Sequence, residues 1–536
     1  MTRVIRNMAY EQEMGMKEMK APGVYIVEYP ASPVSAQSVP TSVPVFIGYT
    51  PRAEDFPGHD CVNQAIRITS YDEFAAMFLQ ENACGFPTQF AVLPRSDVTG
   101  KTPELVLNGE SFAVTPDPDT VYYMVASVRM FFQNGGSTAY IISLGNYGPA
   151  SGKYQQQADL PVVNNNVNKD AYLRAIASLD HEHEPAICVM PDAVLLGSEA
   201  YAEVMNAALT MAERTNRFVC LLDIACGLSP DPADHISEVE NFRNNLPNSS
   251  GYREALSFGV SYFPYLCTTQ AANFAPDFRH IFAGDLKALA KFLEPDILCK
   301  APMKEVLELP ASADRVFNPA EIHQFLLSNS DHYRRLIQAV AERANVLPPS
   351  GAMAGIYAKT DQEAGVWAAP ANVTVEGVSN LCVAINDVQQ SYYLGTAEGK
   401  SVNVIRLFPA LGVRVWGART LDNSADGSQY ISVKRTLIML EQTILLAARQ
   451  YVFEPNNAQT WAALKSDVTA LLTNIWSAGG IIGNRPEDAF QVDIDLGTTM
   501  SATDITEGNM NLQVKLALIR PGEFFIISVR QEMQVC

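Results

Sequence analysis

The segment Asp180–Glu184, with the sequence DHEHE, is the densest group of side chains in the chain that could do chemistry. Imidazole and carboxylate groups are ligands that transition metals take in proteins. The segment lies between a predicted helix that ends near Leu179 and a predicted strand at Ala186, and no third metal-binding motif accompanies His181 and His183. We therefore expect a solvated loop here rather than a metal site.

A second candidate is the stretch from Val346 to Asn372, which is rich in glycine, alanine and proline. Glycine-rich loops can cradle a phosphate, but the loops that do so carry a lysine beside their second glycine. The residues from Gly351 to Gly365 lack that lysine. The stretch therefore favours close backbone packing, because glycine lets chain segments approach one another and proline stiffens them.

Other signatures of catalysis are absent from the sequence. It contains no phosphate-binding P-loop, dinucleotide-binding turn, zinc-protease helix or nucleophile elbow. The DIDLG segment at Asp493 has part of a calcium-loop pattern without the remaining ligands or the closing glutamate, so an alternating strand explains it better. Scattered histidines and cysteines can still meet in three dimensions, which leaves open a cytosolic α/β enzyme with a non-local active site.

Composition narrows the class of protein. A chain of 536 residues exceeds the roughly 250–300 residues that one hydrophobic core supports, so we expect several domains. Its net charge of −20 and the lack of a basic cluster argue against nucleic acid as a partner. Nine scattered cysteines indicate reduced thiols and folding in the cytosol. We expect no secretion signal and no direct membrane insertion.

The hydrophobic pattern predicts an α/β fold of mixed α+β type with more than one domain. A strand is expected from Val43 to Tyr49, a helix capped by Ser70, and a small β insertion over residues 88–120. In the middle region a strand at Ala186, a helix over about Glu199–Thr215 and a further strand form a βαβ unit, which favours parallel pairing.

The last third of the chain predicts two long amphipathic helices that cover a sheet. The first is capped by Ser432, with its polar face on Arg435, Gln442 and Arg449. The apolar face of the second carries Trp461, Leu464, Val468, Leu471 and Ile475, and this helix stops at Gly479 and Gly480. Alternating strands follow at 490–496 and 512–518, and the run from Glu523 to Cys536 is strand-like almost to its end.

Six segments, in one order, resemble the contractile tail sheath family. They are APGVYIVEY near the start, FFQNGGSTAYI at 131–141, PPSGAMAGIYAKTDQEAGVWAAPAN at 348–372, VWGARTL at 415–421, VFEPNNAQTW at 452–461 and RPGEFF at 520–525. The resemblance spans nearly the whole chain and is strongest from Pro348 to Phe525. The family comprises the sheaths of contractile phage tails, phage-tail-like bacteriocins and extracellular contractile injection systems.

The resemblance implies a structural subunit rather than an enzyme, and it implies no cofactor and no metal. Subunits of this family stack as hexameric rings around an inner tube, and contraction drives the tube through a target envelope. Their partners are further copies of the chain, the tube, the baseplate and a terminator or cap protein. Folding and assembly would take place in the bacterial cytoplasm, within a phage tail or a tail-like particle that lysis releases.

The resemblance also implies a domain plan: a tube-facing core with a sheet and two long helices, and an outer α/β domain with the small β insertion. We expect the boundaries to be 1–20 (linker arm), 21–87 (start of the α/β domain), 88–120 (insertion), 121–347 (middle domain), 348–372 (junction), 373–522 (core) and 523–536 (C-terminal arm).

The segments expected to link subunits are the two arms, which in this family add strands to neighbouring sheets. The residues concerned are Val24, Tyr25, Ile26 and Val27, and Phe525, Ile527, Val529 and Met533. Packing at the junction is expected from Gly351, Gly355, Trp367 and Pro370, and tube contact from Lys434, Arg435 and Arg449. Besides the enzyme, a monomeric structural or adhesion protein remains an alternative, although unpaired strand ends would be a liability for it.

Overall fold

The protein, described by a computed structural model, divides into two compact units. Within the described residues, the larger unit comprises parts of Pro40–Glu363 and Pro370–Ser424, and the smaller comprises Val39, Ala364–Ala369 and 427–523. The described ranges are 39–55, 58–79, 87–101, 104–247, 253–269, 276–297, 318–395, 399–422 and 427–523.

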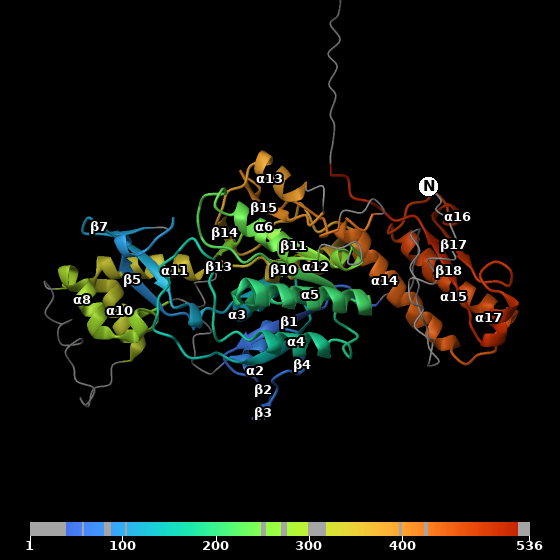
Figure 1. Cartoon of the computed structure of the whole chain (residues 1–536), viewed down its shortest axis with the longest axis horizontal. Helices are drawn as coiled ribbons and strands as arrows, with labels where there is room; N and C mark the ends of the chain where they lie inside the picture. Colours follow the sequence, from blue (N-terminus) through green and yellow to red (C-terminus); the bar gives the residue numbers. More distant parts are fainter. Residues whose placement is uncertain are drawn as a thin grey trace, which may run out of the picture. The chain divides into compact units, whose positions relative to one another are not determined.

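An eight-stranded sheet is the centre of the larger unit, and its strand order is β16-β15-β11-β10-β9-β1-β8-β4 (Figure 1). Six neighbouring strands, from β15 to β8, are parallel, while β16 and β4 add antiparallel edges. The parallel pairing predicted for the βαβ unit is confirmed between β9 and β10. The strands are β1 (Pro44–Thr50), β4 (Ala65–Ile68), β8 (Ala139–Asn146), β9 (Ile187–Val189), β10 (Val219–Asp223), β11 (Gly259–Phe263), β15 (Asn403–Phe408) and β16 (Gly412–Val415).

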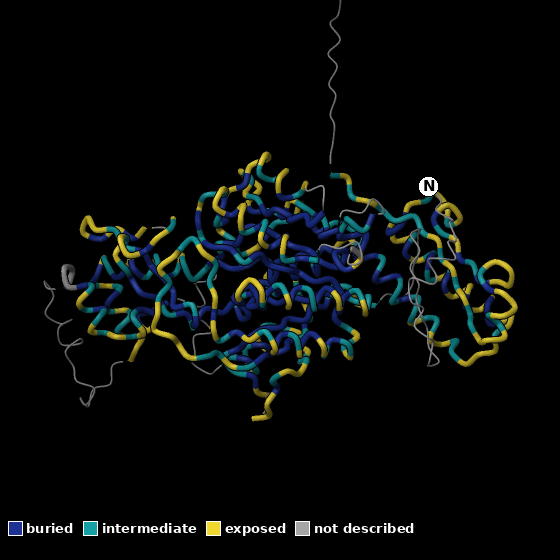
Figure 2. The backbone as a smooth tube through the Cα atoms, in the orientation of Figure 1, coloured by how far each residue is buried: buried dark blue, intermediate teal, exposed yellow. Residues whose placement is uncertain are grey.

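Helices pack on this sheet because their apolar residues recur along one face. Strand β1 contacts α3 (Met124–Gln133), while β10 contacts α5 (Ser198–Thr215). Ser70 caps α2 (Tyr71–Phe78) by accepting from the Glu73 amide, as the sequence predicts. The buried backbone is concentrated in the central sheet and the helices that cover it (Figure 2).

The remaining elements of this unit are short or connect larger ones. Three strands form a small sheet in the order β13-β12-β14. The elements are β2 (Glu54–Asp55), β3 (His59–Asp60), α4 (Lys169–Ser178), α6 (Ile236–Asn245), α7 (Arg253–Ser257), β12 (Leu266–Thr268), β13 (Val346–Leu347), β14 (Val378–Leu381), α13 (Asp387–Leu394), and short 3-10 turns such as Pro191–Leu195.

The predicted β insertion is a three-stranded sheet in the order β5-β7-β6, and it has its own hydrophobic core. Helices from far along the chain supply the other half of that core, with Phe90 and Val92 of β5 packed in one cluster with Leu293 and Tyr333. The elements are β5 (Phe90–Pro94), β6 (Leu105–Leu107), β7 (Glu110–Pro116), α8 (Leu286–Ile297), α10 (Pro319–Asn329) and α11 (Asp331–Ala344).

The smaller unit contains the two predicted long helices, which share one core with the two predicted strands. These strands pair antiparallel as β17–β18. Helix α15 buries Trp461, Leu464, Val468 and Ile475 against Val492 and Met439. The elements are α14 (Ile431–Ala448), α15 (Ala458–Ser477), α16 (Pro486–Ala489), β17 (Phe490–Asp493), α17 (Ala502–Glu507) and β18 (Gln513–Leu516).

Two local predictions differ from the structure. Helix α14 begins at Ile431 with Tyr430 in the cap position, so Ser432 lies inside the first turn and does not cap it. On α15, Leu472 is buried in place of the predicted Leu471, which is only partly buried. The junction expected at 348–372 includes a helix, α12 (Ser350–Ala364), most of whose residues up to Thr360 are buried. A helix of small residues presents little amphipathic contrast, which explains why its period is weak.

Candidate functional site

Helices α3 and α12 approach closely at two glycines of α12, Gly351 and Gly355. A Cβ atom on Gly351 would lie 2.5 Å from the carbonyl oxygen of Ser127, and one on Gly355 would lie 2.4 Å from that of Phe131. From Gly351 to Gly355 the contact on α3 also advances by four residues, from Ser127 to Phe131. The two helices therefore run side by side in the same direction. This spacing leaves no room for side chains between the helices.

Buried aspartates hold the first turn of each of these two helices. Asp192 accepts hydrogen bonds from the amides of Tyr123 and Met124, at 2.5 and 3.0 Å, where α3 begins. Asp223 accepts from the amide of Ser350 at 3.0 Å and from the Ser350 hydroxyl, where α12 begins. Helix N-termini favour negative groups because their first amides have no partner within the helix.

Both carboxyl groups lie at the carboxyl ends of neighbouring parallel strands, where α/β enzymes place their catalytic groups. Asp223 ends β10, and Asp192 follows β9. Burial raises the pKa of Asp223 to about 7 and that of Asp192 to about 6, while the hydrogen bonds to each act in the opposite direction. Because backbone amides already occupy both carboxyl groups, their arrangement supports packing of α3 and α12 rather than catalysis. An aspartate at the end of an apolar strand, or three residues beyond it, was the sequence signal for both.

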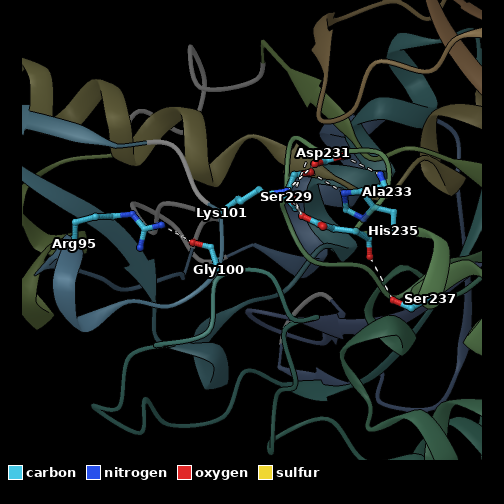
Figure 3. Close-up of polar contacts among 9 residues, drawn as sticks. Arg95, Gly100, Lys101, Ser229, Asp231, Ala233, His235 and Ser237 are labelled. Carbon is cyan, nitrogen blue, oxygen red and sulfur yellow. Dashed lines mark hydrogen bonds and ion pairs between the residues drawn. The ribbon is translucent and has the colours of Figure 1, made fainter.

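A second polar site links the β insertion to the loop after β10 (Figure 3). The Lys101 ammonium lies 2.6 Å from Asp231 and 3.2 Å from Asp234, and these hydrogen bonds raise the pKa of Lys101. Within the loop, Ser229 donates to Asp234 at 2.6 Å. The ion pairs of Lys101 with Asp231 and Asp234 are half-exposed. Because such pairs add little to folding stability, their main effect is to orient the insertion and the loop relative to each other.

The DHEHE segment lies outside helices and strands, as expected, and His181 and His183 are exposed. His183 contacts the Arg217 guanidinium through Nδ1, and Glu184 accepts from the Tyr140 hydroxyl at 2.5 Å. Across the described ranges, these residues form no group of three metal-binding side chains. Asp493 is part of β17 and pairs with Lys515, which agrees with the strand interpretation.

The residues predicted at the junction divide between the two units. Gly351, Gly355 and Pro370 belong to the larger unit, whereas Trp367 belongs to the smaller one. Trp367 packs at the edge of the core of the smaller unit, where a Cβ on Gly480 would lie 2.8 Å from its ring. Pro370 is buried. The chain thus passes between the units on both sides of the segment Ala364–Ala369.

The three candidates for tube contact differ in exposure. Lys434 and Arg435 are buried, at 2% and 4% exposure, while Arg449 at the end of α14 is exposed. Arg435, which the sequence predicted on the exposed polar face of this helix, is therefore buried in the single chain. Tube contact stays a prediction for all three, with Arg449 the most accessible of them.

The predicted linking residues lie outside the described residues. These are Val24, Tyr25, Ile26 and Val27 in the N-terminal segment, and Phe525, Ile527, Val529 and Met533 in the C-terminal one. The structure describes the sheet formed by residues that precede this C-terminal segment in the chain: β17 and β18 form a two-stranded pair, and Ile481 bridges to Leu518 beside that pair.

Comparison with known proteins shows what the chain is similar to. Residues 426–532 match the family described as the phage tail sheath C-terminal domain. The tail sheath protein of Vibrio phage KVP40 is 29% identical over 159 residues, covering 29% of this chain and 23% of that protein. A putative prophage major tail sheath protein of Pseudomonas aeruginosa is 24% identical over 186 residues, covering 34% of this chain and 45% of that protein. The chain thus spans less than half the length of these two relatives.

A solved structure extends the likeness to almost the whole chain. The anti-feeding prophage (AFP) helical sheath in its contracted state has a TM-score of 0.55 and 24% identity, covering 95% of this chain and 99% of that one. At this level of identity the likeness shows a shared fold. In the described part of the chain, no helix has the length and apolar character needed to cross a membrane.

Proposed function

We propose that the chain is the subunit of a contractile sheath, because its residues 426–532 match the phage tail sheath C-terminal domain and its fold resembles that of a helical sheath. In this proposal, copies polymerise as stacked hexameric rings around an inner tube. The likeness of the fold to a helical sheath over 95% of the chain carries the proposal. The subunit acts mechanically and not as an enzyme, so no cofactor takes part.

The linkage between subunits is proposed to be strand addition by the two terminal arms. Two-stranded sheets are only marginally stable by themselves, and an extended segment can supply a further strand through main-chain hydrogen bonds. The β17–β18 sheet has two strands within the described residues, which supports such an addition. Val24–Val27 from one neighbour and 523–536 from another are the proposed strands. Head-to-tail contacts of this kind build open helical assemblies.

Contraction is proposed as a change between two packings of the same subunits. The outer domains form new contacts in the contracted lattice, while the arms keep the subunits connected. Each subunit releases a small amount of free energy on contraction, and the sum along the sheath drives the tube. The proposed domain plan puts residues 373–522 toward the tube and 88–120 outward. The proposed partners are further copies of this chain, the tube, the baseplate and a cap protein, within a phage tail or tail-like particle.

Electron microscopy of the purified chain, alone and with its tube protein, tests this function. We expect striated hollow cylinders, and we expect them to be lost on deletion of residues 524–536. Val529→Asp should have the same effect, because a charge interrupts an added strand. Val106→Asp is the matched control, since Val106 is a strand valine of the insertion with 49% exposure.

The outcomes separate the alternatives. Cylinders from the full chain that persist after the deletion would refute strand addition but leave the sheath function standing. Discrete particles under every condition, with stability that depends on a small ligand, would instead favour the enzyme alternative.

A further inference from the structure

The loop after β10 brings together three side chains that bind transition metals: Cys226, His235 and Glu238. One ligand atom from each lies within 4.8 Å of the other two. Cys226 and His235 are buried, and Glu238 is partly buried at the first turn of α6. In the ranges that the structure describes, it is the one group of three such residues. No part of the proposed sheath function uses it.

The surrounding contacts orient these side chains as the second layer of a metal site does. The Nε2 atom of His235 lies 2.6 Å from the carbonyl oxygen of Ser229, and Nδ1 lies 2.5 Å from Glu238 Oε2. Metal-binding histidines commonly donate their other N–H to a backbone carbonyl, which fixes the tautomer and the ring orientation. The second carboxylate oxygen, Glu238 Oε1, accepts from the amide of Gly227 at 2.6 Å. Nδ1 and Oε2 are therefore the atoms that would bind a metal.

We propose that Cys226, His235 and Glu238 bind one Zn²⁺ ion per chain through Sγ, Nδ1 and Oε2, with water in the fourth position. Thiolate, imidazole and carboxylate together are a ligand set that zinc takes. On binding, the ion displaces two protons, one from the Cys226 thiol and one from between His235 and Glu238. One divalent cation with one thiolate and one carboxylate has no net charge, which suits a buried position.

The consequence of binding is mechanical. In the sequence, the ligands flank the segment that carries Asp231 and Asp234, the partners of Lys101. A bound ion would fix this loop, and with it the contact to the β insertion. Sequence motifs gave no sign of the site, because the spacing Cys-x8-His-x2-Glu matches none of the standard zinc patterns.

Zinc titration of the reduced, chelator-treated full chain tests the proposal, with metal content measured by mass spectrometry. We expect one Zn²⁺ per chain and a higher thermal midpoint with zinc. Co²⁺ in place of zinc should give a thiolate-to-cobalt charge-transfer band. Cys226→Ser should abolish that band and weaken Zn²⁺ binding by at least roughly tenfold. Cys61→Ser is the matched control, since Cys61 is also buried and its hydrogen bond to the His59 carbonyl suits a serine.

Glu238→Gln keeps the proposal testable if the serine variant fails to fold, because an amide retains the contact with Gly227 but is a poor zinc ligand. Circular dichroism establishes that each variant is folded. Zinc content equal in wild type, Cys226→Ser and Glu238→Gln, or no binding by the wild type at all, would overturn the proposal. His235 and Glu238 would then be a buried ion pair and nothing more.

Discussion

At the scale of single residues, the larger unit depends on positions where nothing but glycine or a buried carboxyl group fits. Gly351 and Gly355 set the distance between α3 and α12, and Asp192 and Asp223 hold the first turns of these helices. Buried polar groups must keep their hydrogen-bond partners, and close-packed glycines cannot take a side chain without displacing backbone. Both features fix α3 and α12 relative to the sheet.

Gly355→Val should destabilise the larger unit by about 3 kcal/mol or more, because its side chain would overlap the Phe131 carbonyl and force the helices apart. The measurement is the midpoint of urea unfolding, monitored by circular dichroism. Gly197→Ala is the control, since a Cβ there meets nothing within 4 Å and its φ of −60° suits alanine. Equal midpoints for wild type and Gly355→Val would contradict the close packing.

Asp223 should make the folded protein less stable as pH rises. Its pKa is about 7 in the fold against 3.8 for the unfolded chain, so the folded state binds the proton more tightly. That contribution is present at acidic pH and is lost toward neutral pH, at up to about 1.4 kcal/mol per pH unit. Asp223→Asn should therefore flatten the fall in unfolding free energy between roughly pH 4 and pH 7, the interval between the two pKa values. An identical pH profile in the variant would show that Asp223 is ionised throughout.

At the scale of elements, the smaller unit is held by apolar burial between its two long helices and one pair of strands. Val468, Leu472 and Val492 lie in a single core with Met439 of α14. The helical and strand periods in the sequence predicted this arrangement, because each element buries one face and exposes the other. The insertion sheet differs, since residues beyond 280 complete its core.

Leu464→Ala on α15 should destabilise the smaller unit by about 2–5 kcal/mol, because it leaves a cavity in that core. Leu464 is 3% exposed, whereas Leu446 on α14 is 52% exposed, so Leu446→Ala is the matched control and should change little. Tryptophan fluorescence is a suitable measurement, since Trp367, Trp461 and Trp476 belong to this core. Equal losses in both variants would refute the assignment of the buried face.

At the scale of the whole molecule, function is proposed to come from assembly and not from any site in one chain. A net charge of −20 gives the isolated subunit strong self-repulsion. In the proposed sheath, positively charged residues that face the tube would offset part of this negative charge at the contact with the tube. Of the three proposed residues, Arg449 is the exposed one, so its contribution can be tested without disturbing a core.

Arg449→Glu should weaken co-sedimentation of sheath subunits with the tube protein while leaving tube-independent polymers intact, because it reverses one surface charge. The loss should shrink at high salt, where exposed charges are screened. Arg485→Glu is the control, since the Arg485 side chain is also exposed, at 73%, and belongs to the same unit. Wild-type binding by Arg449→Glu would remove this residue from the proposed contact.

The sequence by itself determined the class of fold, the parallel pairing of β9 and β10, the insertion sheet and the two C-terminal helices. Each of these follows from local periodicity and capping, which neighbouring residues encode. The tertiary structure alone decided that the glycine-rich stretch is a buried helix against α3, and that Lys434 and Arg435 are buried. It alone joined Phe90 to Tyr333 and Cys226 to His235 and Glu238. Such pairings depend on how distant segments meet, and no local period records them.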